Sequence, residues 1–226
     1  MSVPTAITVT GQTLLLHPDR AVIWPKAGAI IVADTHFGKS SVFNRNGLAV
    51  PGGTDADDRA RLTRLLSSCG GRRLIVLGDF LHAPLAHGSQ ESHDMQQWTR
   101  SLAGIHIQVI AGNHDRGVLT GWRGSIDWIV GDHLEPPFRF VHDAGAGHEH
   151  ADIFSLSGHV HPVITLKGLR KRAARVAVFL LRKNGMILPS FGSFTGGHVV
   201  RAAPGERIFA VSPDRVVPFP VLCGTR

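Results

Sequence analysis

The chain has 226 residues, of which 43% are hydrophobic and 18% are charged, so it can bury a sizeable core and a disordered chain is excluded. It carries 24 Lys and Arg against 17 Asp and Glu, and the formal net charge of +7 favours an anionic partner such as nucleic acid. Two cysteines, Cys69 and Cys223, exclude a disulfide framework and suit a reducing cytoplasm. With no signal peptide and no long apolar run, we expect a cytoplasmic protein without a membrane span.

The predicted elements alternate between strands and helices. A hairpin or edge pair is expected within Ala6–Trp24. Five short apolar runs follow, and each ends in a polar cluster: Ala29–Ala33, Leu74–Leu77, Ile105–Ala111, Phe138–Val141 and Ile153–Leu156. Helices are predicted between them, over Asp55–Ser68, with Leu62, Leu65 and Leu66 on one face, and over Glu91–Leu102.

Strands alone are predicted toward the end of the chain, at Ala173–Leu181, Arg207–Val211 and Val216–Phe219. The alternation before them indicates an α/β architecture with a largely parallel or mixed sheet. No repeat and no linker is visible, so a single domain over residues 1–226 is expected.

Each of the five apolar runs leads into side chains that can bind a metal. In chain order these are Asp34 and His36, Asp79, Asn113 and His114, His142, and His159 and His161. Ligands bind beyond the carboxyl ends of strands in open α/β sheets, so we expect these residues along one rim. Mixed carboxylate, imidazole and amide ligands suit Mn, Fe, Zn or Co better than Ca or Mg.

This pattern resembles the calcineurin-like metallophosphoesterase family. The family signature is DxH, GD, GNH followed by Asp or Glu, a lone His, and GHxH. The five blocks occur here in that order, as Asp34-Thr35-His36, Gly78-Asp79, Gly112-Asn113-His114-Asp115, His142, and Gly158-His159-Val160-His161. The resemblance implies a four-layer α-β-β-α sandwich of two mixed sheets flanked by helices.

The resemblance also implies a centre of two divalent metals, with Mn²⁺ favoured and Fe, Zn or Co as alternatives. One metal would be bound by Asp34, His36, Asp79 and His161, and the other by Asp79, Asn113, His142 and His159, so that Asp79 bridges them. Ions ~3.5–4 Å apart would generate a bridging hydroxide and neutralise phosphate oxygens. His114 would protonate the leaving oxygen or stabilise the phosphorane, and Asp115 would orient His114.

Two histidine assignments leave alternatives open. His142 is preferred as the lone His because it directly follows an apolar run, and His133, His148 and His150 are the alternatives. His82, in Gly-Asp-Phe-Leu-His, could hold a metal-bound histidine in place, since such ligands usually need a hydrogen-bond partner.

A closer resemblance is to the bacterial ligase-associated metallophosphoesterases, described as DNA-repair nucleases. It lies in three stretches: Asp34–Lys39, Asn46–Pro51 and Leu188–Gly197. It implies manganese-dependent phosphodiesterase or endonuclease action on DNA or RNA, single strands included. The DNA ligase and helicase of the same repair pathway are the protein partners that it suggests.

Basic residues near the metal blocks are candidates for substrate binding. The segment Lys167–Lys183 holds seven basic residues and no acid, and Lys171, Arg172 and Arg175 could form a phosphate-backbone track there. A solvated loop is the alternative. Lys39 and Arg45 could also grip phosphate. The apolar C-terminal segments suggest a homodimer. A phosphatase, a small-nucleotide hydrolase and a non-catalytic scaffold stay open as other functions.

Overall fold

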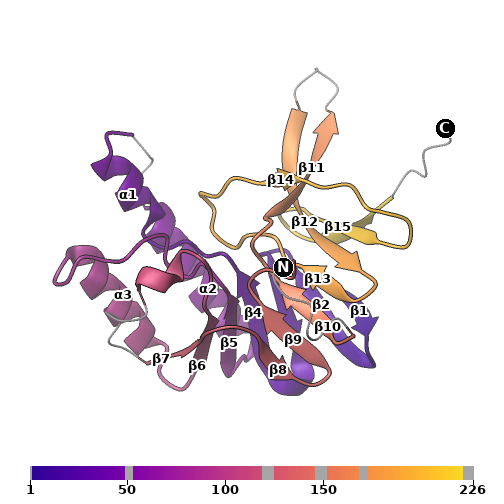
Figure 1. Ribbon diagram of the computed structural model, residues 1–226, viewed down its shortest axis with the longest axis horizontal. Coiled ribbons are helices and arrows are strands. Elements are labelled where there is room, and N and C mark those ends of the chain that lie inside the picture. Colours follow the sequence, from indigo (N-terminus) through magenta and orange to yellow (C-terminus); the bar gives the residue numbers. More distant parts are fainter. Residues whose placement is uncertain (1, 49–52, 119–124, 146–151, 168–172, 221–226) are drawn as a thin grey trace.

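The computed structural model describes residues 2–48, 53–118, 125–145, 152–167 and 173–220 (Figure 1). Its first sheet has seven strands in sequence order. They are β1 (Thr5–Val9), β2 (Gln12–His17), β3 (Ala21–Trp24), β4 (Ala29–Ala33), β5 (Arg73–Leu77), β6 (His106–Ile110) and β7 (Ile126–Ile129). The strands β1 to β4 pair antiparallel and β4 to β7 pair parallel, so the sheet is mixed, as predicted.

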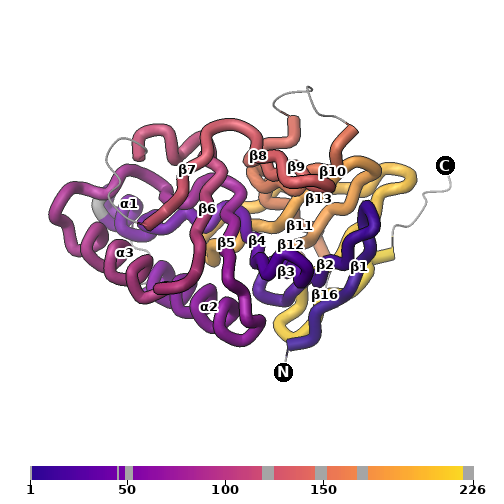
Figure 2. The backbone as a smooth tube through the Cα atoms, turned by 90° about the horizontal axis from the view of Figure 1, so that it is seen from below, coloured from indigo at the N-terminus to yellow at the C-terminus, as the bar shows by residue number. Residues whose placement is uncertain are grey.

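Helices cover one face of the first sheet. After the one-turn 3₁₀ helix η1 (Pro25–Ala27) come α1 (Lys39–Arg45), α2 (Thr54–Cys69), α3 (Gln90–Ser101) and a second 3₁₀ turn, η2 (Asp115–Gly117). Leu62, Leu65 and Leu66 of α2 are buried, which confirms the predicted apolar face. They pack with Ile30 and Val32 of β4. Figure 2 shows α2 and α3 along one side of β4–β6 and the second sheet on the other.

Among the described residues, the second sheet has nine strands and is also mixed. Its main path runs β14-β11-β12-β13-β10-β9-β8, and β15 and β16 extend it from β12. The strands are β8 (His133–Glu135), β9 (Phe138–Val141), β10 (Phe154–Ser157), β11 (Pro162–Lys167), β12 (Ala173–Arg182), β13 (Gly185–Ile187), β14 (His198–Val199), β15 (Arg207–Val211) and β16 (Val216–Phe219). Strands β9, β10 and β13 run parallel to one another.

The main core lies between the two sheets. Ile31 and Ala33 face it from β4, and Phe138, Phe140 and Phe179 face it from the second sheet. Ile30 and Val32 alternate with them toward the helices, because successive strand residues point to opposite faces. This packing confirms an α/β sandwich of two mixed sheets. In the described part of the chain, the helices that were expected outside both sheets lie outside the first sheet only.

Several elements were not predicted. Their sequences lack a clear apolar period, and most of them have only a few residues. They are the helix α1 and the strands β7, β8, β11, β13 and β14. No helix in the described ranges is long and apolar enough to span a membrane.

Candidate metal centre

Three neighbouring parallel strands of the first sheet end at the same level. Ala33, Leu77 and Ile110 are register partners at the ends of β4, β5 and β6. The polar residues that follow these strands therefore meet at one rim, as the sequence predicts. They are Asp34 and His36 after β4, Asp79 after β5, and Asn113 and His114 after β6.

The second sheet supplies the other predicted ligands to the same rim. His142 follows β9, while His159 and His161 follow β10, and Val141 and Ser157 are partners at the ends of those strands. The Nδ1 of His142 lies 3.6 Å from Oδ1 of Asp34, so the two sheets meet at these side chains. The candidate centre thus lies across the junction of the two sheets.

The backbone at this rim is unusual. Among the described residues other than glycine, seven have a positive φ, and five of them are predicted ligands: Asp34, His36, Asp79, His159 and His161. This conformation costs on the order of 1 kcal/mol or more for each such residue and clusters at functional sites. The strain supports a functional role for the rim, independently of the motif.

The first group of ligand atoms is formed by Asp34, His36 and His161, whose donor atoms all lie within 4.8 Å of one another. The Nε2 of His161 is 3.6 Å from Oδ2 of Asp34 and 3.4 Å from Nε2 of His36. Asp79 adjoins this group, because its Oδ2 is 3.8 Å from Nε2 of His36. These are the four side chains assigned to one metal.

The second group surrounds His142. Its Nε2 is 2.9 Å from Oδ1 of Asn113, 3.0 Å from Nδ1 of His159 and 3.7 Å from Oδ1 of Asp79. These are the four side chains assigned to the other metal, and Asp79 adjoins both groups. His142 is also buried, with 8% of its surface exposed.

Backbone carbonyl groups determine where two of these imidazoles carry their protons. The Nδ1 of His142 donates to the carbonyl of Leu77 at 3.2 Å, and the Nδ1 of His161 donates to the carbonyl of Gly196 at 3.3 Å. Since a carbonyl oxygen only accepts, each Nδ1 holds the proton and each Nε2 presents a lone pair to the cluster. Lone pairs and carboxylate oxygens that converge in this way fit divalent cations.

Burial makes the cluster unfavourable without cations. Asp34 is fully buried, burial raises the pKa of its carboxyl, and its Oδ1 has no hydrogen-bond partner among the described residues. Burial, and next the neighbouring His161, lowers the pKa of His36 to about 2, which keeps that imidazole neutral. Buried carboxylates beside neutral imidazoles are the donor set that a transition metal requires.

Glycine is required at two turns because ligand side chains lie against the backbone. Gly78 has φ 78°, and a Cβ there would overlap the ring of His142. A Cβ at Gly158 would overlap the carboxylate of Asp34. The close approach of a ligand from another element is the physical reason for glycine at both turns.

His114 lies beside both groups, with its Nε2 4.0 Å from Oδ2 of Asp79. Its Nδ1 donates to the carbonyl of His82 at 2.8 Å, and the two rings stack with centroids 4.8 Å apart. Burial lowers the pKa of His82 to about 4. His82 is thus in contact with the predicted catalytic histidine through its backbone and ring face, and its ring also lies edge-on to that of the predicted ligand His36, with centroids 5.5 Å apart.

The contacts of Asp115 differ from those expected. Its carboxylate accepts hydrogen bonds from the backbone N–H groups of Phe80, Leu81 and Gly112, at 3.0–3.2 Å. It therefore ties the loop after β5 to the loop after β6. The interpretation that Asp115 orients the ring of His114 is corrected, because the carbonyl of His82 occupies that position.

The remaining predicted residues either belong to neither ligand group or fall outside the described residues. His133 lies on β8, 3.8 Å from Glu135 and stacked on Phe140, and belongs to neither ligand group. Lys39 lies on α1 with Nζ 5.9 Å from the centroid of the Phe43 ring, and Arg175 lies exposed on β12. His148, His150, Lys171, Arg172 and the side chain of Arg45 fall outside the described residues.

Sequence reasoning missed a group of residues that hold the loop 189–197 beside Asp34. Asp58, on α2 and buried, accepts from the N–H of Ser193 at 2.7 Å and from its hydroxyl at 2.6 Å. Arg61 bonds to Asp58 at 2.8 Å and lies over the ring of Phe191. The loop in turn donates to the backbone carbonyl of Asp34, from the hydroxyl of Ser190 at 2.7 Å. The motif stretch Leu188–Gly197 and the acidic residue on the apolar side of α2 were the signals that could have indicated this network.

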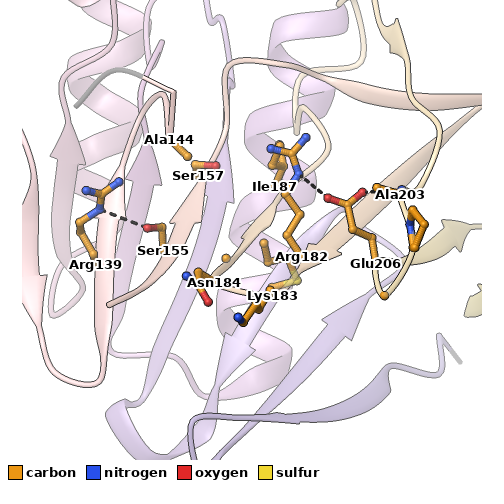
Figure 3. A pocket seen from close by; sticks show the side chains of 14 residues that line it. Arg139, Ala144, Ser155, Ser157, Arg182, Lys183, Asn184, Ile187, Ala203 and Glu206 are labelled. Carbon is orange, nitrogen blue, oxygen red and sulfur yellow. Dashed lines mark hydrogen bonds and ion pairs between the residues drawn. The ribbon is translucent and has the colours of Figure 1, made fainter. Parts of the chain in front are cut away.

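Cavities adjoin the cluster on both sides. One of about 340 Å³ is lined by Asn113, His142 and His159 together with Arg116, Asp132 and Asp143. Another, of about 200 Å³, lies on the side of His161. A larger cavity of about 610 Å³ contains none of the predicted ligands and lies over the outer-facing side chains of β9, β10 and β13 (Figure 3).

Comparison with known proteins gave a clear structural match. The crystal structure of the Pseudomonas putida nuclease MPE is 33% identical, covers 96% of this chain and 100% of its own, and superposes with a TM-score of 0.81. The E. coli phosphoesterase YfcE is 15% identical, with 85% of this chain and 98% of its own covered and a TM-score of 0.46. No protein-family model and no curated protein matches the chain.

Proposed function

The chain belongs to the calcineurin-like metallophosphoesterase family, and we propose that it is a metal-dependent nuclease that hydrolyses phosphodiester bonds of DNA or RNA. Hydrolysis of phosphate esters follows from the family. We further propose that the enzyme uses two metals, prefers manganese, cleaves endonucleolytically and acts in DNA repair. The net charge of +7 and the likeness to a nuclease support action on nucleic acid.

The proposal assigns the metals to the two groups of ligand atoms around Asp79. Asp34, His36 and His161 would bind one cation, and Asn113, His142 and His159 the other. When bound, such a pair of cations activates water for attack on phosphorus and neutralises charge on the phosphate oxygens. The loops that hold these side chains are themselves fastened, by Asp115 on one side and by Ser190 on the other.

His114 would act on the leaving oxygen. Its Nδ1 proton is committed to the carbonyl of His82, so only Nε2 can exchange a proton at the reacting phosphate. A protonated Nε2 would donate to the departing oxygen, which is the role of a general acid. The position of this nitrogen, 4.0 Å from the carboxylate of Asp79 that adjoins both groups, is the observation that supports the proposal most.

The proposal is tested with purified protein, circular single-stranded DNA and a panel of divalent metals. A circle has no ends, so its conversion to linear and shorter products identifies endonucleolytic cleavage. We expect cleavage with manganese, none in EDTA, and none by Asp79→Asn. Hydrolysis of phosphate monoesters without any hydrolysis of diesters would contradict the proposal and favour a phosphatase.

Salt dependence separates a nucleic-acid substrate from a small one. Backbone phosphates release counterions on binding, so cleavage of DNA should fall steeply between 50 and 200 mM salt. Hydrolysis of bis(p-nitrophenyl) phosphate, which has a single negative charge, should change little over the same range. Equal salt dependence of both reactions would argue against a nucleic-acid substrate.

A further inference from the structure

The cavity beside His161 is lined by basic and small polar groups. Its lining includes Arg20, Arg175, Ser190, Ser193 and Thr195, and the described residues around it include no carboxylate. His161 belongs both to this cavity and to the first ligand group. The cavity of about 200 Å³ therefore lies directly next to the first ligand group, and the imidazole of His161 stands between the two.

The two arginines come from separate parts of the chain. Arg20 lies in the turn between β2 and β3 and has a positive φ of 62°. Its Nη1 donates to the carbonyls of Ser190 and Gly192, at 3.3 and 3.4 Å. Arg175 lies on β12, where its Nη1 is 3.5 Å from the carbonyl of Gly197. Each guanidinium thus rests on the loop 189–197 through one nitrogen.

The two arginines of this cavity form no ion pair within the protein. Neither Arg20 nor Arg175 has a carboxylate within 4.0 Å in the described part of the chain. Burial, and next the nearby Arg61, lowers the pKa of Arg20, while Asp58 and Asp19 act on it in the opposite direction from a greater distance. An anion in the cavity could form the direct ion pair that both guanidinium groups lack.

The larger cavity on the second sheet differs in this respect. Its Arg139 is held by Ser155 and lies 3.3 Å from Asp132, and its Arg182 lies 3.2 Å from Glu206 (Figure 3). Both arginines there are already paired with acids. The arginines of the large cavity are therefore paired with acids and those of the small cavity are not, although Lys183 of the large cavity also has no acid within 4.0 Å among the described residues.

We infer that the cavity of Arg20 and Arg175 binds the phosphate group of the nucleotide next to the bond being cleaved. This inference rests on the proposed nuclease function and adds a substrate requirement to it: a second phosphate, one nucleotide away, on the His161 side. The cavity is smaller than the roughly 300–1,000 Å³ typical of sites for whole small molecules, so it suits a single anionic group.

The inference is tested with thymidine derivatives that fix the scissile bond. One pair carries a p-nitrophenyl phosphodiester on the 5′ oxygen, with or without a phosphate on the 3′ oxygen, and a second pair has the two positions exchanged. For one pair, we expect the added phosphate to raise kcat/KM of the wild type by about 10-fold, as for one charge-assisted hydrogen bond. The same addition in the other pair should have little effect.

Arg175→Ala should remove this gain, so that the variant cleaves both members of the responsive pair with nearly the same kcat/KM. Arg182→Ala is the matched control, because Arg182 lies exposed on the same strand but beside the other cavity, and it should retain the gain. A gain that survives Arg175→Ala would overturn the inference, as would an equal loss on both members of the pair.

Failure of the proposed function would look different. If the wild type cleaves none of these diesters with any metal, the nuclease proposal fails. The phosphate site is then tested by measuring oligonucleotide binding. Fluorescence anisotropy would compare a labelled thymidine oligonucleotide with its uncharged methylphosphonate analogue. Arg175→Ala should weaken binding of the charged oligonucleotide about 10-fold and leave the analogue unaffected. Equal binding of the charged oligonucleotide by Arg175→Ala and wild type would overturn the inference.

Discussion

The ring of His114 is fixed by the backbone of His82, whose carbonyl oxygen lies 2.8 Å from Nδ1 of His114. The two rings also stack at 4.8 Å, with an angle of 25° between their planes. The far nitrogen, Nε2, is thereby directed toward the cluster around Asp79. A proton donor held in this way should matter most when the leaving group needs a proton.

The first prediction concerns that dependence on the leaving group. His114→Ala should lower kcat on DNA by about 10²–10⁴-fold, the usual contribution of general acid catalysis. The loss should be much smaller on a p-nitrophenyl ester, whose leaving group departs without a proton. Metal content, measured by elemental analysis, should stay that of the wild type. His106→Ala, on the exposed start of β6, is the control. Equal losses on both substrates would assign His114 to positioning only.

The second prediction concerns the carboxylate next to both ligand groups. Asp79→Asn keeps the shape of the side chain and its acceptor for the N–H of His114 but removes one buried charge. In EDTA the variant should unfold at the same temperature as the wild type or higher, because the charge is uncompensated there. In manganese the wild type should unfold at the higher temperature, because metal binding stabilises only a protein that binds the metal. Calorimetry in both solutions measures this, and a variant less stable in both would contradict it.

The third prediction concerns the anchor of the loop 189–197. Asp58→Ala removes the acceptor for two groups of Ser193 and deprives Arg61 of its ion-pair partner. We expect a loss of about 2–4 kcal/mol in the free energy of unfolding, measured with urea. Asp57→Ala, one residue earlier on α2 and exposed, is the matched control and should change stability by less than about 0.5 kcal/mol. A small effect of Asp58→Ala would show that the loop is held by other contacts.

The fourth prediction concerns the pH dependence of a pair that joins the two sheets. Arg73 on β5 donates to both oxygens of Glu135 on β8, at 2.9 and 2.8 Å, and holds the pKa of Glu135 below its ordinary value of 4.5. A depressed pKa stabilises the fold above the unfolded pKa, and this is lost as the pH falls through the folded value. Glu135→Gln should therefore cost about 0.5–1 kcal/mol at pH 7, and the difference should shrink progressively as the pH falls below the ordinary value of 4.5.

Glu206→Gln serves as the control for that pair, because its partner Arg182 is half exposed. Its effect at pH 7 should be the smaller of the two. Denaturant titrations of both variants and the wild type at several pH values provide the measurement. A difference between wild type and Glu135→Gln that is independent of pH would mean that packing, and not charge, makes the contribution.

The rim of the sheet was predictable because its ligands are local features of the sequence. Asp34 and His142 each follow a short apolar run directly, Asp79 follows one after a single glycine, and parallel strands bring such positions to one level. The same reasoning also favours His142 over His133 as the ligand. The prediction needed no knowledge of distances, only of where the strands end.

The residues that hold the loops of the rim in place were not predictable in the same way. Asp58 bonds to Ser193 across 135 positions, and Arg20 bonds to Ser190 across 170. Such contacts depend on the tertiary packing of segments whose own patterns look like ordinary helix or turn. Asp115 was placed in the right region, but the three backbone groups that it binds become visible only once the loops are folded together.

The candidate ligands come from both halves of the sandwich, with Asp34 and Asp79 from one sheet and His142 and His161 from the other. Cations bound there would crosslink the two sheets at one end of their shared core. Metal supply would then govern how long the protein survives in a cell as well as how fast it works. Starved of metal, the rim would open before the remainder of the fold, and proteases would reach the chain there first.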